Sequence, residues 1–139
     1  MHKLLLVDND PIRRTLTRYA IQEVYESEVK IHELPNGYEA RDDILEINPD
    51  LVFMSIDMQD MDGVDAAIEM EKRGYNNPII LWTAKQSFLY EYQKTDTIRI
   101  LDRNPKSYVL LGEEPNSKMA IETLKESLGE PANYNQQSF

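Results

Sequence analysis

The sequence predicts an α/β fold in which a parallel five-stranded sheet is covered by helices on both faces. Five short apolar runs alternate with segments whose apolar residues recur at helical spacing, and this order is typical of such sheets. The run at residues 51–56 is apolar almost throughout, as expected of a central strand buried on both faces. The 139 residues fit one domain, which we expect over residues 1–129, followed by a polar tail at 130–139.

Three of the strands are expected in the first half of the chain. Residues 3–7 form an apolar run that is too short for a helix, and residues 28–33 alternate between apolar and polar side chains, as an edge strand does. Residues 51–56 form the third strand and lead into an acidic loop. The helix that joins the second run to the third carries the apolar residues Ala40, Ile44, Leu45 and Ile47.

The first helix is expected at residues 11–25. Asp10 is suited to cap this helix, and Pro11 suits its first position. The apolar residues that recur at helical spacing, and that we expect to face the core, are Ile12, Leu16, Tyr19, Ala20 and Val24. The arginines elsewhere on the helix, which we expect to form a solvated face, are Arg13, Arg14 and Arg18.

The second half continues the alternation, with strands expected at residues 78–82 and 108–111. A helix at 63–73 precedes them, and a last helix ends at Gly129. The least regular part is residues 85–106. Its apolar side chains suggest a helix and then a second short element, and they are Phe88, Leu89, Tyr92, Ile98, Ile100 and Leu101.

The composition limits the classes of partner. The 25 acids outnumber the 15 bases and give a formal net charge of −10, which repels nucleic acid and anionic membrane surfaces. The chain has no cysteine, which fits a reducing compartment. No apolar run approaches the roughly 20 residues that span a bilayer. We therefore expect a soluble cytoplasmic protein that binds neither nucleic acid nor membranes.

The expected strand order is the flavodoxin-like 2-1-3-4-5, in a doubly wound three-layer sandwich. In this order the first and third strands lie side by side, and ligands bind where their carboxyl ends meet. An acidic pocket is therefore expected at that edge, next to Ser55 and with Thr83 beside it, and its members are Asp8, Asn9, Asp10 and Asp57.

Several motifs in this order resemble the CheY-like receiver domain of response regulators in two-component, or phosphorelay, signalling. The resemblance covers about residues 2–129, and its segments are 6–11, 36–40, 49–52, 58–63, 78–84 and 108–109. It implies phosphoryl transfer from a histidine kinase to an aspartate at the end of the third strand. It also implies a Mg²⁺ ion held by acids after the first strand, with a Thr and a Lys that contact the phosphoryl oxygens.

Three of these five family positions differ in this sequence. The acceptor position falls on Ser55, the second acid on Asn9 and the lysine on Leu111, whereas Asp8 and Thr83 match the family. A serine hydroxyl is a poor nucleophile without an adjacent base. The resemblance therefore implies a degenerate pseudo-receiver that is not an enzyme, has no catalytic residue and acts through protein–protein interaction.

Two alternatives stay open at this point. One is a Mg²⁺-dependent phosphoacceptor with an altered site in which Asp57 or Asp8 takes part. The other is a flavodoxin-like electron carrier, which the acidic loop at residues 8–11 disfavours because it would repel a phosphate. Asp8, Asp10 and Asp57 are either weak Mg²⁺ ligands or simply solvated loop acids, and no other cofactor is expected.

The resemblance also implies a switch and a partner surface. Thr83 and Tyr108 match the two residues that relay phosphorylation in the family, although Tyr108 is equally suited to a half-buried strand position. The expected partner is a histidine kinase or another signalling protein. A homodimer could form through the helix after the fourth strand, the fifth strand and the last helix. Candidate contact residues for a partner, unless they pack in the core, are Phe88, Tyr90 and Tyr92.

Overall fold

The computed structural model describes residues 1–84, 100 and 102–131, and these form a parallel sheet with helices on both faces. The sheet has the order β2-β1-β3-β4-β5, with parallel pairing between all neighbours, so the predicted fold class and strand order are confirmed. The strands are β1 His2–Val7, β2 Val29–Leu34, β3 Leu51–Ser55, β4 Ile79–Thr83 and β5 Tyr108–Leu111.

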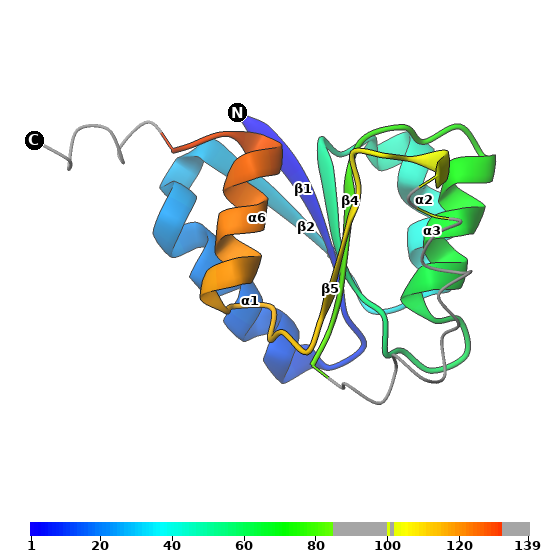
Figure 1. The fold of residues 1–139 in the computed structure, drawn as a ribbon, viewed down its shortest axis with the longest axis horizontal. Coiled ribbons are helices and arrows are strands. Elements are labelled where there is room, and N and C mark those ends of the chain that lie inside the picture. Colours follow the sequence, from blue (N-terminus) through cyan, green and yellow to red (C-terminus); the bar gives the residue numbers. More distant parts are fainter. Residues whose placement is uncertain (85–99, 101, 132–139) are drawn as a thin grey trace, which may run out of the picture.

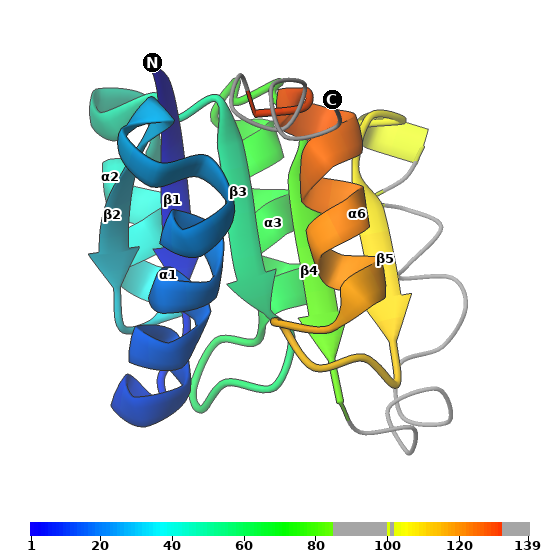
Figure 2. The same ribbon diagram turned by 90° about the vertical axis from the view of Figure 1, so that its left-hand side faces the viewer.

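The helices cover the two faces of the sheet in pairs, and α1 and α6 lie on one side while α2 and α3 lie on the other (Figure 1). They are α1 Pro11–Tyr25, α2 Gly37–Ile47, α3 Gly63–Lys72 and α6 Lys118–Leu128, with a short 3₁₀ turn, η1 Glu26–Glu28, after α1. Figure 2 shows that the strands all end at the same edge, where the loops after β1, β3 and β4 begin. A side-chain cap begins each of these α-helices, namely Asp10 for α1, Asn36 for α2, Asp62 for α3 and Ser117 for α6.

The core is two apolar layers, one on each side of the sheet. Along β3, Val52 and Met54 pack on the side of α2 and α3, whereas Leu51 and Phe53 pack on the side of α1 and α6. All five residues of β3 are buried. Because helices cover both faces of the strand, its sequence does not alternate between apolar and polar side chains as that of a half-exposed strand does. The strand that carries Ser55 to the edge is therefore held on both sides.

The predicted buried face of α1 was wrong for three of its five residues. Ile12, Leu16 and Tyr19 are exposed, by 74%, 56% and 57%, and the residues that face the sheet are Thr17, Ile21 and Tyr25, with Val24 partly buried beside them. The helix carries two stripes at helical spacing, and the buried one includes a polar residue. Thr17 tolerates burial because its hydroxyl donates a hydrogen bond to the Arg13 carbonyl, at 2.7 Å.

Some sequence predictions lie outside the described residues. These are the contact residues Phe88, Tyr90 and Tyr92, most of the segment at 85–106, and most of the expected tail, so a domain boundary at residue 129 stays a prediction. Ile100 is described, and it is fully buried in the layer beside α3. Among the helices of residues 1–84, 100 and 102–131, none combines the length and the apolar character needed to cross a membrane.

Tyr25 ties the end of α1 to the end of α6, and its replacement has a predictable effect. Its hydroxyl donates to the Gly129 carbonyl at 2.7 Å, and burial raises the pKa of Tyr25 from 10.0 to about 12. Because the folded-state pKa is the higher one, the resulting stability is complete below the unfolded pKa and is lost as pH rises through the folded pKa. Tyr25→Phe should cost about 1 kcal/mol at pH 7 through the lost hydrogen bond.

The pH dependence of stability should differ between the native chain and Tyr25→Phe mainly at alkaline pH. In urea unfolding from neutral pH upward, Tyr25→Phe should lose less stability than the native chain as the pH rises from 10.0 to about 12. Equal losses in the two chains would contradict this assignment.

Candidate functional site

Three buried polar residues meet at the carboxyl edge of the sheet. Asp8 directly follows β1, Ser55 is the last residue of β3, and Thr83 is the last residue of β4. The strand register places Val7 beside Met54 and Ser55 beside Trp82, so these polar side chains come from neighbouring strand ends. Asp8 and Thr83 are each 1% exposed and Ser55 is 0% exposed.

The loop after β3 is folded back tightly over the strand end. The amide of Ile56 donates to the Trp82 carbonyl at 2.8 Å, and the amide of Gly63 donates to the Ile56 carbonyl at 3.0 Å. A Cβ atom on Gly63 would lie 2.3 Å from the Ser55 carbonyl oxygen, so this close approach requires glycine. The Ser55 hydroxyl, held beneath the loop, donates a long hydrogen bond of 3.4 Å to the Asp57 carbonyl.

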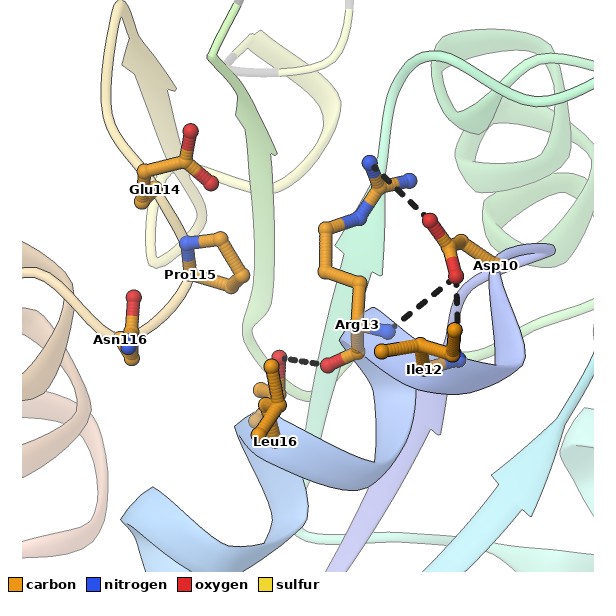
Figure 3. Close-up of a pocket in the computed structure, with 8 residues that line it drawn as sticks. Asp10, Ile12, Arg13, Leu16, Glu114, Pro115 and Asn116 are labelled. Atoms are coloured by element: carbon orange, nitrogen blue, oxygen red, sulfur yellow. Dashed lines mark hydrogen bonds and ion pairs between the residues drawn. The ribbon is translucent and has the colours of Figure 1, made fainter.

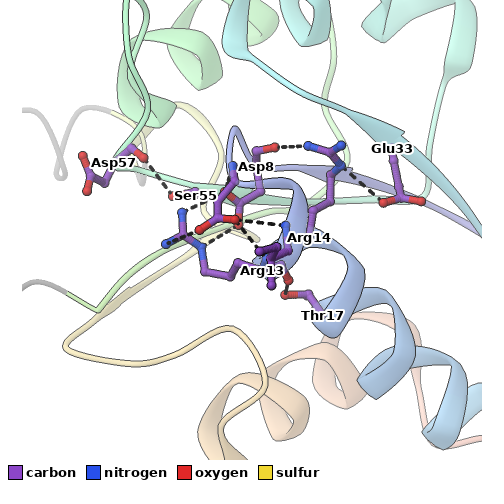
Figure 4. A network of polar contacts seen from close by, with 9 residues as sticks. Asp8, Arg13, Arg14, Thr17, Glu33, Ser55 and Asp57 are labelled. Atoms are coloured by element: carbon purple, nitrogen blue, oxygen red, sulfur yellow. Dashed lines mark hydrogen bonds and ion pairs between the residues drawn. The ribbon is translucent and has the colours of Figure 1, made fainter.

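An arginine from the first turn of α1 neutralises the buried carboxylate. Arg13 Nε donates to Asp8 Oδ2 and Arg13 Nη2 donates to Asp8 Oδ1, both at 2.8 Å (Figure 4). This two-point geometry is the strongest form of guanidinium–carboxylate pairing. The hydrogen bond to Asp8 is the main cause that raises the pKa of Arg13, and the charges of Asp10 and Asp57 act in the same direction.

The same guanidinium also covers an aromatic ring. Arg13 lies 5.0 Å from the centre of the Trp82 ring, and Trp82 itself is 2% exposed. A cation over a tryptophan face is attracted by the negative charge of the ring face. Arg13 is thus fixed by a carboxylate and by an aromatic ring, both of which come from strand ends.

The other two arginines of α1 also point back toward the sheet. Arg14 donates to the Asp8 carbonyl, and it forms an ion pair with Glu33 at 3.3 Å between Nε and Oε1. Arg18 pairs with the second Glu33 oxygen at 3.0 Å, although neither Nε atom is aligned for a hydrogen bond. The expected solvated arginine face was therefore wrong. Arg13 lies in the first turn of α1, where the helix dipole disfavours a cation. A cation at this position of the sequence could therefore have indicated a nearby acidic partner.

The remaining acids of the expected pocket have other roles. Asp10 caps α1, because its Oδ1 accepts from the amides of Ile12 and Arg13 at 3.0 and 3.2 Å (Figure 3). Asn9 is exposed, and Asp57 is partly buried in the loop after β3. The structure thus brings Asp8 and Ser55 to one edge of the sheet, whereas the Asp10 carboxylate is engaged in capping α1.

The expected lysine position and one expected switch position, Tyr108, lie on β5, whereas the other, Thr83, ends β4. Leu111 pairs with Thr83 at the end of the strand and packs against the core, so the side chain at this position is not a cation. Tyr108 is at the start of β5, paired with Ile80, and burial together with the Glu126 carboxylate raises its pKa. Thr83 and Tyr108 therefore lie at opposite ends of their strands, and their switch role stays a prediction.

The donor atoms of this edge do not fit a divalent cation. Magnesium requires several free oxygen ligands, but both Asp8 oxygens already accept from Arg13, and Oδ1 also accepts from the Asp10 amide at 3.0 Å. Within the described part of the chain, no group of three or more Asp, Glu or His side chains is arranged to hold a metal ion.

The order of the strands and the polar edge define a doubly wound α/β protein with a flavodoxin-like sheet. The family model for the response regulator receiver domain matches residues 4–110. The chain therefore belongs to the receiver domain family of the response regulators.

Curated relatives share this domain as a part of longer proteins. The regulatory protein AtoC of Escherichia coli is 37% identical over 86 residues, which are 60% of this chain and 18% of AtoC. The transcriptional regulatory protein SrrA of Staphylococcus aureus is 35% identical over 82 residues, or 59% of this chain and 32% of SrrA. The chain thus spans about a fifth to a third of these two relatives.

Solved receiver structures share the fold over nearly the whole chain. The CheY-like receiver domain protein of Methanospirillum hungatei has a TM-score of 0.71 at 16% identity and covers 100% of this chain and 99% of its own. The response regulator TrrA of Thermotoga maritima, solved in complex with Mg(2+)-BeF, has a TM-score of 0.68 at 27% identity, with 91% and 99% covered.

Proposed function

We propose that this chain is a pseudo-receiver that acts in two-component signalling by protein–protein interaction and does not accept a phosphoryl group on an aspartate. The observation that carries the proposal is Ser55, the last residue of β3, which falls where the resemblance to the family implies the acceptor aspartate. Receiver domains are typically signalling modules without catalysis of their own, and they interact with histidine kinases and other signalling proteins. This chain keeps the framework for such contacts.

Ser55 is poorly suited to replace the missing carboxylate. Its side chain is 0% exposed, and the backbone around Gly63 closes over it, so an incoming phosphodonor would have to open the loop. Serine also needs a base to become a nucleophile, and the two histidines of the chain stand at positions 2 and 32, in β1 and β2. Neither strand contributes its histidine to the end where Ser55 lies, because His2 begins β1 and His32 pairs with Leu5 within the sheet.

The other changed positions act in the same direction. Phosphoryl transfer depends on neutralising the charge that spreads over the phosphoryl oxygens. Leu111 supplies no cation, and Asn9 lacks the charge of a second acid. The alternative acceptor, Asp57, keeps a carboxylate, but it lies two residues further along, in the loop. Membership of the receiver family argues against the electron-carrier alternative.

The partners follow from the family and the charge. We expect the partner to be a histidine kinase or another signalling protein in the cytoplasm, and we also propose a homodimer through the face that includes β5 and α6. The net charge of −10 disfavours nucleic acid and anionic membranes and favours a basic protein surface.

A phosphodonor experiment tests the proposal. The native chain is incubated with MgCl₂ and a small-molecule phosphodonor and then weighed by intact mass spectrometry, beside a receiver that has the acceptor aspartate. The mass of the native chain should stay unchanged while the control gains a phosphoryl group. A stable phosphoryl group on Asp57 or Asp8, lost in the corresponding Asp→Asn variant, would overturn the proposal.

A further inference from the structure

The acidic edge of this receiver already contains a cation, and that cation is part of the chain. Asp8 is a carboxylate with 1% exposure, a position at which an unpaired negative charge is strongly disfavoured. Each of its oxygens accepts a hydrogen bond of 2.8 Å from the Arg13 guanidinium. The charge that a bound metal would balance is therefore balanced by a side chain.

The guanidinium is held in this place by more than one contact. It stacks over Trp82 at 5.0 Å, and a second anion, Asp10 Oδ2, lies 4.0 Å from Arg13 Nη1. The tether to α1 makes the contact intramolecular, so its effective concentration greatly exceeds that of a free ion. A Mg²⁺ ion would have to displace the arginine and also lose part of its tightly held water.

We propose that Arg13 is a built-in cation that takes the place of a divalent metal ion at Asp8, so that the native chain excludes Mg²⁺ from this edge and removal of the guanidinium admits it. This proposal concerns the charge of Asp8 and does not depend on Ser55. It would hold even if Asp57 accepted a phosphoryl group by another route. It also explains how an acid of the family pattern is retained in a site whose donor atoms do not fit a metal.

The position of Arg13 leaves its guanidinium accessible, so a metal ion can be exchanged for it. The Arg13 side chain is 31% exposed, and its outer side borders a pocket between the start of α1 and the loop before α6, with Glu114 and Pro115 on the far wall (Figure 3). Solvent and ions therefore have a path to the guanidinium. Exclusion of Mg²⁺ then depends on the ion pair itself and not on a closed surface.

Trp82 offers a direct readout, because it is the one tryptophan of the chain and lies under Arg13. Its emission is followed while the native chain, Arg13→Gln and Arg18→Gln are titrated with MgCl₂ at constant ionic strength. Arg18→Gln is the matched control, because it makes the same charge change on the same helix. Arg18 pairs with Glu33 and not with Asp8. We expect a saturable response in Arg13→Gln, with an affinity for Mg²⁺ about tenfold or more above that of the other two chains.

Thermal unfolding with and without MgCl₂ provides the second measurement. Mg²⁺ should raise the Tm of Arg13→Gln and leave the Tm of the native chain and of Arg18→Gln unchanged. A native chain that binds Mg²⁺ as tightly as Arg13→Gln would overturn the proposal, and so would a folded Arg13→Gln chain with no response. If Arg13→Gln does not fold, Arg13→Lys replaces it, and its weaker, single-point pairing should permit a response that the native chain lacks.

Discussion

Arg13→Gln is expected to lower the free energy of unfolding by about 3 kcal/mol, because it leaves the Asp8 carboxylate buried without its counter-ion. Asp8 is 1% exposed in the native chain, so it has little of the hydration that stabilises a surface carboxylate. This value is at the lower end of the range for breaking a buried ion pair, because the Arg13 side chain is 31% exposed and is therefore partly hydrated in the native chain. Loss of the stacking on Trp82 adds to the effect.

A double-mutant cycle separates the ion pair from the other contacts of Arg13. Asp8→Asn removes the buried charge, so Arg13→Gln in that background should cost much less than it does in the native chain. The comparison variant is Arg18→Gln, whose pair with Glu33 is partly exposed and should be worth less than about 1 kcal/mol. Urea unfolding of the four cycle members and the comparison measures this. An Arg13→Gln cost no larger than that of Arg18→Gln would contradict the importance of the pair.

Gly63→Ala is expected to have a comparable effect, about 3 kcal/mol, through a steric clash with the main chain. The added Cβ would lie 2.3 Å from the Ser55 carbonyl oxygen and 2.9 Å from the Ile56 Cα, and neither atom is the end of a flexible side chain. The loop after β3 must therefore shift. The hydrogen bond from the Gly63 amide to the Ile56 carbonyl, at 3.0 Å, should be weakened by the same movement.

Gly74→Ala is the control for this clash. Gly74 has a φ of +106° and no atom within 4 Å of the position of an added Cβ, so its replacement strains only its own backbone. Both variants should lose stability, but only Gly63→Ala should also move the amide signals of Ser55 and Ile56 in NMR spectra. Unchanged signals at both residues would show that the close approach at Gly63 is not a constraint.

The strands were predictable because each is a short apolar run, and β3 is buried on both faces in the way that its composition indicates. The face of α1 was not predictable from apolar spacing alone. Its buried stripe contains Thr17, a polar residue whose hydroxyl is satisfied within the helix, while the more apolar stripe with Ile12 and Leu16 is exposed. Hydrophobic periodicity cannot choose between two such stripes.

The positions of Asp8 and Ser55 at the strand ends followed from the strand order, but the pairing of Asp8 did not. Charged residues on a helix were expected to face solvent, whereas Arg13 turns back over the strand end to reach an acid five positions earlier in the chain. That contact depends on the corner between β1 and α1 and on the Trp82 ring from β4, which come together only in the folded chain. The poor fit of this edge to a metal ion could likewise be recognised only in the folded chain, because it depends on the hydrogen bonds that already occupy both Asp8 oxygens.

The most direct measurement of the claim that this edge accepts no phosphoryl group uses a phosphoryl mimic on the native chain. TrrA was solved in complex with Mg(2+)-BeF, and the same reagent can be titrated here while amide NMR signals and Trp82 emission are recorded. We predict no saturable change at Ser55, Asp57 or Thr83, and no change in Trp82 emission. Saturable shifts that converge on these three residues would contradict the claim.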